Sequence, residues 1–139
     1  MSITQDVRTY LLTQTTVTAQ VGTRIYYDHL PQRATLPALV VNLITSVSQR
    51  EVDAASGTAR ARVQVDCYAA TYAASVSLGE LVRKVTEQYT GTMGSTTVDR
   101  AHVETVTELD DGPTDGSDAY RYIRSLDVVL WHSEALPIT

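Results

Sequence analysis

The side chains in this sequence that could take part in catalysis or bind a metal are one cysteine, three histidines and several aspartates and glutamates. A cysteine beside a histidine forms a nucleophilic pair, because the imidazole accepts the thiol proton. Cys67 would form such a pair with His102 or His132 on a neighbouring strand. Cys67 falls, however, on the apolar side of an alternating segment, together with Val63 and Val65. A small buried core residue is therefore the favoured interpretation.

Two further pairs offer weaker chemistry. His102 and Glu104 are two residues apart on one face of a predicted strand, but two ligands without an obvious third do not make a zinc site. Asp66 and Asp127 would form a carboxylate pair if their strands adjoin. The same strands carry four arginines, so a salt-bridged surface is favoured instead. These arginines are Arg60, Arg62, Arg121 and Arg124.

Sites for phosphate or nucleic-acid bases are not apparent either. The two glycines of residues 91–95 (GTMGS) follow a predicted helix and no lysine comes after them, which excludes a phosphate-binding loop. The eight tyrosines are scattered, without the aromatic and basic clusters on which bases stack. We therefore expect no enzymatic activity, no cofactor, no bound metal and no small-molecule substrate.

Bulk properties narrow the class of protein further. The 139 residues suit a single domain, predicted to span 1–139, and 43% hydrophobic residues are enough for a core. A net charge of −5 disfavours binding to the phosphates of nucleic acids. The sequence shows no signal peptide and no apolar run of membrane-spanning length. With one cysteine, no internal disulfide forms, which agrees with folding in a reducing cytoplasm.

These side chains must be positioned by helices and strands that the periodicity of the sequence predicts. Apolar residues spaced three and four apart predict a helix that starts at Ser2, and another that starts at Thr71 and ends at Gly91. A Thr-rich stretch ends the first helix, and a short second turn at 17–21 stops at Gly22. Residues 24–27 predict a short strand. Residues 39–44 are nearly all apolar, which is typical of a central strand covered on both faces.

A long hairpin is the most informative feature. Residues 59–68 alternate between apolar and polar side chains and follow the strand that begins at Leu39, with a turn at 53–57. Each arm would extend about a dozen residues, or roughly 40 Å at about 3.4 Å per residue. Its tip, residues 46–62, has Val47 and Val52 as its sizeable apolar residues, too little for a two-stranded ribbon to be stable alone. We therefore expect the tip to contact another molecule.

Two more strands, 97–109 with a bulge and 120–132, close the domain. Between them residues 110–118 carry four aspartates and no large apolar side chain, which predicts an exposed loop. They are Asp110, Asp111, Asp115 and Asp118. The order of elements predicts an α+β fold: an antiparallel or mixed sheet of four to five strands, two helices packed on one face and a long projecting β-hairpin.

Several stretches in this order resemble the tail-completion or tail-terminator proteins of long-tailed phages and prophages. They include residues 21–26 (VGTRIY), 36–41 (LPALVV), 59–69 (ARARVQVDCYA) and 122–131 (YIRSLDVVLW). With the helix at 71–91, they cover nearly the whole chain. Each stretch alone is loose, and their order and spacing carry the resemblance. The acidic loop is longer than is usual in this family.

The resemblance implies a structural protein of the virus particle, made in the bacterial host cytoplasm and located at the head-tail interface. It implies a ring, usually of six copies, that caps the tail tube and binds the tail-tube protein and the head-tail connector. DNA would contact it only in passing through the channel. Candidate interface residues on the hairpin are Arg50, Glu51, Val52, Asp53, Arg60 and Arg62. Asp110, Asp111, Asp115 and Asp118 are candidates for a channel-facing loop that repels DNA.

Two alternatives stay open on the sequence alone. One is another role in the same particle, as a head-tail adaptor or minor tail protein. The other is a small α+β ligand-binding domain, which requires a concave pocket with converging polar groups. The partner that the protein binds distinguishes the first from a tail terminator. A tightly bound small molecule would favour the second.

Overall fold

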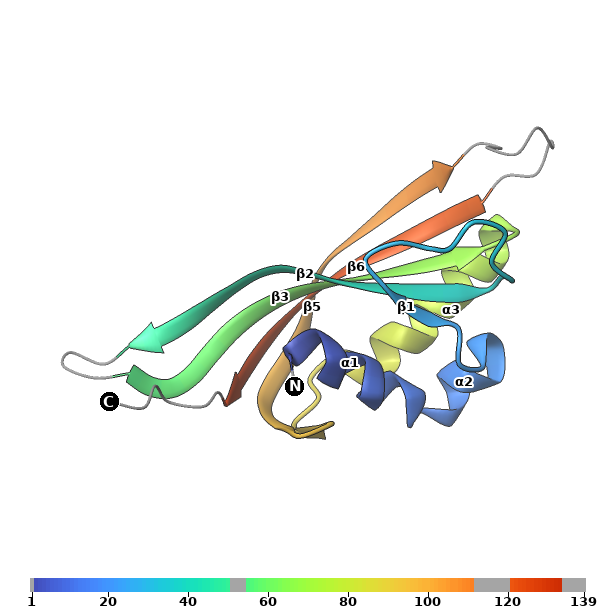
Figure 1. Cartoon of the computed structure of the whole chain (residues 1–139). Helices are drawn as coiled ribbons and strands as arrows, with labels where there is room; N and C mark the ends of the chain where they lie inside the picture. The colour runs from blue at the N-terminus through green and yellow to red at the C-terminus, as the bar shows by residue number, and fades with distance from the viewer. Residues whose placement is uncertain (1, 51–54, 112–120, 134–139) are drawn as a thin grey trace.

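A computed structural model describes residues 2–50, 55–111 and 121–133 of the chain. Three helices pack together on one face of a twisted sheet, as Figure 1 shows. The helices are α1 (Ile3–Leu12), α2 (Thr15–Val21) and α3 (Tyr72–Thr86). The strands are β1 (Ile25–Tyr27), β2 (Ala38–Arg50), β3 (Ala55–Ala69), β4 (Gly91–Met93), β5 (Thr96–Asp111) and β6 (Arg121–Ser133). The α+β class is therefore confirmed.

Over the described residues the sheet is mixed, with six strands in the order β1-β2-β3-β6-β5-β4. β1 runs parallel to β2, and all other neighbours are antiparallel. The prediction of four to five strands was wrong by one, because residues 91–93, for which no strand was predicted, pair with β5. The long hairpin is confirmed, with arms of 13 and 15 residues. β6 lies beside β3 as far as Thr58, so much of the hairpin belongs to a wider sheet.

The helices also differ in number from the prediction of two. Residues 15–21 form a helix, α2, despite their threonines, because Val17 and Val21 are fully buried and tertiary contacts override weak propensity. Gly22 ends α2 as predicted, with a φ of 58°. Ser2 caps α1 through a capping box, and Thr71 caps α3. α3 ends at Thr86, earlier than the predicted Gly91.

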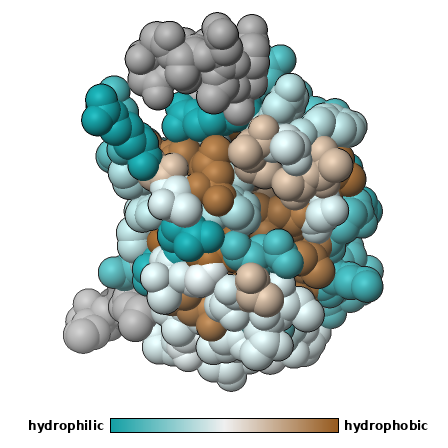
Figure 2. Space-filling model, turned by 90° about the vertical axis from the view of Figure 1, so that its right-hand side faces the viewer, coloured by the Kyte–Doolittle hydropathy of each residue, from teal (hydrophilic) through white to brown (hydrophobic). Residues whose placement is uncertain are grey.

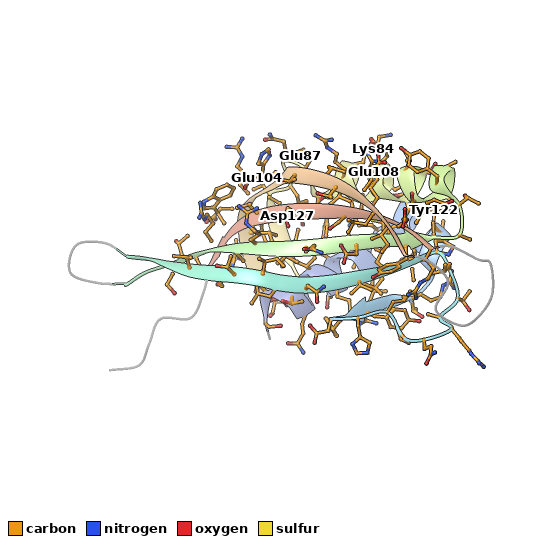
Figure 3. All side chains as sticks on the ribbon, turned by 90° about the horizontal axis from the view of Figure 1, so that it is seen from above. Lys84, Glu87, Glu104, Glu108, Tyr122 and Asp127 are labelled. Atoms are coloured by element: carbon orange, nitrogen blue, oxygen red, sulfur yellow. The ribbon has the colours of Figure 1, made fainter. Side chains whose placement is uncertain are left out.

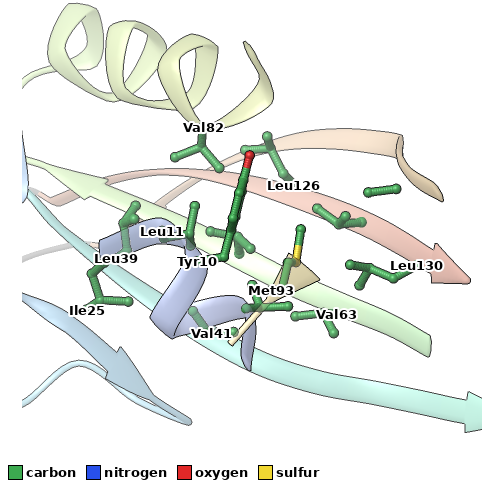
Figure 4. Close-up of a cluster of buried hydrophobic side chains, with 14 of the residues drawn as sticks. Tyr10, Leu11, Ile25, Leu39, Val41, Val63, Val82, Met93, Leu126 and Leu130 are labelled. Carbon is green, nitrogen blue, oxygen red and sulfur yellow. The ribbon is translucent and has the colours of Figure 1, made fainter. Parts of the chain in front are cut away.

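The core lies between the helices and the face of the sheet that they cover. Figure 4 shows how Leu11 and Tyr10 of α1 and Val82 of α3 meet side chains from the strands. Tyr10 packs against Tyr89 at a centroid distance of 4.4 Å, and its hydroxyl donates a hydrogen bond to the Val85 carbonyl. The chain has no phenylalanine, so valine, leucine, isoleucine and these tyrosines fill this volume.

A buried carboxylate fixes the position of α1 against the turn between β4 and β5. Asp6 is fully buried and accepts hydrogen bonds from the Ser95 amide at 3.2 Å, the Ser95 hydroxyl at 3.3 Å and the Thr96 hydroxyl. At Gly94, φ is 56° and an added Cβ would lie 2.3 Å from Asp6 Oδ1. The turn therefore requires glycine both for its backbone conformation and for the close approach of Asp6.

Candidate interaction surfaces

The strongest nucleophile candidate lies in the core. Cys67 is fully buried in the hydrophobic cluster, opposite Leu39 on β2 and Arg124 on β6. Burial raises the pKa of the thiol far above its ordinary value, and the nearby charge of Asp66 adds to the effect. A thiol in this environment stays protonated and shielded from solvent. The interpretation of Cys67 as a core residue is confirmed.

The structure does not bring His102 and Glu104 together around a common point. His102 Nδ1 lies 2.8 Å from Glu87 Oε1, whereas Glu104 binds Arg62. A β-bulge between Val103 and Thr105 changes the register here, so the strict two-residue alternation does not hold. Within the described ranges, no group of three or more His, Cys, Asp or Glu side chains is arranged to hold a metal.

Glu87 was not singled out by the sequence because it lies just beyond α3 and meets β5 through the fold. Its second oxygen accepts a hydrogen bond of 3.0 Å from the Val103 amide. Partial burial raises the pKa of Glu87, but His102, this amide and the Arg83 charge together outweigh it, and the pKa lies below its ordinary value. Glu87 thus joins the end of α3 to β5 and has a structural role.

Arg62 is the centre of an ion-pair group on the face of the sheet opposite the helices. Its guanidinium binds Glu104 at 3.0 Å and Asp127 at 3.2 Å, and Figure 3 labels both carboxylates. Asp66 and Asp127 lie on adjoining strands, as the carboxylate-pair hypothesis requires, but Asp66 accepts hydrogen bonds from Gln64 instead. The predicted salt-bridged surface is confirmed for Arg62 and Asp127. Such pairs are screened by solvent and add little to stability.

A second polar group joins α3 to the other end of the sheet. Arg124 binds Glu108 at 2.8 Å, and the Tyr72 hydroxyl donates to the same carboxylate at 3.0 Å. The hydrogen bond to Glu108 raises the pKa of Tyr72. Gly79 makes this approach possible, since a Cβ there would lie 2.5 Å from Arg124 Cδ. A glycine in the middle of a predicted helix was the signal that sequence reasoning missed.

The predicted hairpin interface is only partly within the described residues. Arg60 is exposed on β3, and Arg62 is half-buried in the ion-pair group. Arg50 is the last residue of β2, and its side chain lies outside the described residues, as do Glu51, Val52 and Asp53 entirely. A role of these six residues in subunit or tube contacts stays a prediction.

The predicted acidic loop begins where β5 ends. Asp110 is exposed on β5. Asp111 is its last residue and pairs with Arg121 of β6 in the strand register, but its side chain lies outside the described residues. Asp115 and Asp118 lie outside them too. The channel-facing role of these four aspartates stays a prediction.

Exposed apolar side chains on β2 are the main feature that sequence reasoning missed. Leu39, Val40 and Val41 are buried, as a central strand requires. Leu43 and Ile44 are 46% and 50% exposed, and Val47 is 48% exposed. The prediction of a strand covered on both faces to residue 44 was therefore wrong at its end. The reason is that the helices below the sheet do not extend under this part of β2, and β1 pairs with β2 only at residues 39–41, so both a face and the edge lack cover beyond Val41.

A groove of about 630 Å³ lies at the other end of the molecule, against α3. Its lining is mostly aliphatic or small, with Leu78 and Leu81 of α3 beside Pro37, and its charged members are Glu80 and Lys84. Figure 2 shows this end as a mosaic of apolar and hydrophilic residues. Its four polar side chains, Gln20, Ser77, Glu80 and Lys84, are all exposed, whereas a pocket for a polar ligand holds a few precisely placed polar groups in a concave apolar site.

Comparison with known proteins gives one family and a fold. The sequence matches the model of the family described as Tail completion protein gp17 over residues 5–124. A chain from a structure titled "Virion of native gene transfer agent (GTA) particle" aligns over 95% of this chain and 96% of its own, with a TM-score of 0.65 and 14% identity. At that identity the likeness shows the fold alone.

The remaining comparisons add little. A second solved chain aligns over 99% of this chain and 100% of its own at 15% identity, but its TM-score of 0.41 carries no argument. A search of curated proteins finds no significant match.

None of the described helices has the length and apolar character needed to cross a bilayer.

Proposed function

The chain belongs to the Tail completion protein gp17 family, and from this premise we propose that it forms a ring that caps the tail tube of a phage particle. The ring ends tube polymerisation and joins the tail to the head connector. Six copies are expected, as the resemblance implies. The chain acts as a structural component of the virus particle and carries out no reaction.

One observation in the structure supports a role in assembly above the others. Beyond Val41, β2 exposes three large apolar side chains on a strand whose outer edge has no neighbour among the described residues. Exposed apolar strand edges are avoided in proteins that work alone, because they promote association. In a protein that functions as an assembly, such an edge can form the contact between subunits. The likeness in fold to a chain of a gene transfer agent virion agrees with this role.

The test is the mass of the purified protein across a concentration series, with and without the tail-tube protein. A defined ring, alone or on the tube, with ring-shaped particles in electron micrographs, is the expected result. A chain that stays monomeric or dimeric in both conditions contradicts the proposal.

The same series separates the ring from the other role in the particle. An adaptor would bind the head connector and ignore the tube, so each partner is titrated separately. A terminator binds the tube end first, and tubes assembled in its presence stay short. Tubes that grow to the same length with and without the protein would favour the adaptor.

A further inference from the structure

Two stretches of sheet edge lie open at opposite corners of the molecule. On β2, residues 42–48 follow the segment that pairs with β1. On β5, residues 104–110 follow the segment that pairs with β4 and with residues 88 and 89. Among the described residues, no backbone hydrogen bond reaches the outer edge of either stretch. Figure 1 shows the two free stretches at opposite ends of the sheet.

Both stretches are accessible along nearly their whole length. Every residue from Leu43 to Ser48 is exposed, and on β5 every residue from Glu104 to Asp110 is exposed except the half-buried Val106. Unpaired N–H and C=O groups on an accessible edge are a template for a strand from another chain. We propose that in the ring the β2 edge of one copy pairs with the β5 edge of the next, so that one sheet continues from subunit to subunit. This proposal rests on the ring proposed above and names its contact.

Strand direction favours this pairing. β2, β3, β6 and β5 are successive antiparallel neighbours, so β5 runs opposite to β2. A neighbour generated by rotation about a ring axis keeps its strand directions relative to that axis. Its β5 therefore arrives antiparallel to β2, the geometry that forms perpendicular hydrogen bonds. The contact uses two different edges, which is the heterologous arrangement that a ring larger than a dimer requires.

The covered segments fix the register of this contact. Each free stretch is seven residues long, and their ends coincide when Ser46 lies opposite Val106 of the next copy, with the bulge of β2 between Leu43 and Thr45 inside the contact. In that register Val41, which pairs with Tyr27 at the end of β1, falls opposite Asp111, the last residue of the neighbour's β5, so β1 and that strand meet at one position. The neighbour's β4 lies beyond the described end of β2. Ser46 and Val106 also project to the helix-covered face, as their partners Ala61 and Leu126 show.

The stagger agrees with closure into a ring. Within one copy, Ser46, Ala61, Leu130 and Ala101 lie in one row across the sheet. Val106 is five residues beyond Ala101, but the bulge between Val103 and Thr105 takes up one of them, and their partners on β6, Leu130 and Leu126, are four residues apart. The axial offset is therefore about 14 Å at about 3.4 Å per residue, and the repeat spans four strand spacings, about 19 Å in total. The resulting strand tilt is about 35°, at the lower end of the range of roughly 35–45° found in closed barrels.

Charge favours β2 with β5 over like edges together. The β5 stretch carries Glu104, Glu108 and Asp110; Arg62 and Arg124 partly neutralise the first two, and the remaining negative charge disfavours pairing of two β5 edges. The β2 stretch (NLITSVS) carries no charge, and Arg60, exposed on β3 directly across from Val47, places a positive charge one strand away. Pairing of two β2 edges would give a closed dimer and would leave the β5 edge of each copy without a partner strand.

The test is a disulfide placed between the two edges. Thr45 and Thr107 are both exposed, and both lie on the face opposite the helices, as their partners Arg62 and Ser125 show. In one chain they are separated by β3 and β6, which is too far for an internal disulfide. The double variant Thr45→Cys/Thr107→Cys is oxidised after assembly, alone and on tail-tube ends. A non-reducing gel should then show linked species from dimer up to the full ring.

Controls separate this contact from chance oxidation. The native Cys67 is fully buried, so background linkage is low. Thr45→Cys/Thr97→Cys places the second cysteine on the part of β5 that β4 covers, and should give no ladder. Thr45→Cys alone should give no dimer, and a strong dimer would show β2–β2 pairing and overturn the proposal. Equal melting temperatures of the variants and the parent establish that each is folded.

The failure of this inference differs from the failure of the ring. A ring of normal mass that gives no ladder overturns the edge pairing and leaves the proposed function standing. No ring in either condition overturns both. A ladder that ends at the mass of the ring supports both at once.

Discussion

The two halves of β2 differ sharply in burial. Leu39 and Val41 are fully buried under α1 and α2, whereas Leu43, an equally apolar side chain on the same face of the strand, is 46% exposed. The difference lies in the cover: β1 and the helices end where the strand continues. One half of the strand therefore stabilises the monomer, and we infer that the other half stabilises an assembly. Substitutions in the two halves should separate these effects.

The largest effect is expected from a matched pair of leucines on the same strand and the same face. Leu39→Ala removes a fully buried side chain and should lower the free energy of unfolding by about 3 kcal/mol. Leu43→Ala removes a side chain that is 46% exposed and should lower it by less than about 0.5 kcal/mol. Urea unfolding of the monomer measures both. Equal losses would remove the distinction between the two halves.

The next effect concerns the buried carboxylate of the helical half. Asp6→Ala leaves three donors without their acceptor, from Ser95 and Thr96, and should lower the free energy of unfolding by about 2–3 kcal/mol. Asp110→Ala, at an exposed position on β5, should change it by less than about 0.5 kcal/mol. Thermal unfolding compares the two variants. A cost for Asp6 no larger than for Asp110 would show that its hydrogen bonds contribute little.

A smaller effect tests the contact between α1 and α3. Tyr10→Phe removes a hydrogen bond to the Val85 carbonyl and should cost about 1 kcal/mol. Burial, with a smaller contribution from Tyr89, raises the pKa of Tyr10 to about 12. Because the folded state favours the protonated phenol, the stability from this group is complete below pH about 10 and is lost as pH rises towards 12.

Alkaline unfolding measures that pH dependence. The parent should lose stability over this window, and Tyr10→Phe should lose less. Tyr89→Phe removes an exposed hydrogen bond to Thr92 and the smaller contribution of Tyr89 to the Tyr10 pKa, so it should keep most of the alkaline loss. The same alkaline loss in the parent and in Tyr10→Phe would assign it to other groups.

The substitution with the smallest expected effect on the stability of the monomer should have a clear effect on assembly. Val47→Glu adds a negative charge to the exposed half of β2 and should leave the free energy of unfolding within about 0.5 kcal/mol of the parent. In the ring it faces the acidic edge of the next copy, and like charges across strands are destabilising. We expect the concentration for half-assembly to rise about tenfold or more, since 1.4 kcal/mol corresponds to a factor of ten.

Val47→Lys is the matched control, because it changes the same position and adds a charge of the opposite sign. The Lys variant should assemble at least as well as the unsubstituted protein. Light scattering across a concentration series measures all three proteins. Equal weakening by Glu and Lys would mean that apolar contact, and not the acidic edge, determines the association.

The sequence by itself determined the α+β class, the long hairpin, the helix caps at Ser2 and Thr71, and the place of Cys67 in the core. These features follow from local rules, because periodicity and capping are properties of neighbouring residues. Local rules failed at α2, where burial of Val17 and Val21 overrides threonine propensity, and at residues 91–93, which become a strand only because β5 lies beside them.

Only the tertiary structure decided which apolar residues are exposed. The run from Leu39 to Ile44 is apolar except for Asn42, and its burial changes near Val41, where β1 and the helices that cover the strand end. The open corner on β5 likewise depends on where β4 and residues 88 and 89 end. An edge is defined by the absence of a neighbour in space, and neighbours distant in sequence leave no local pattern from which that absence can be predicted.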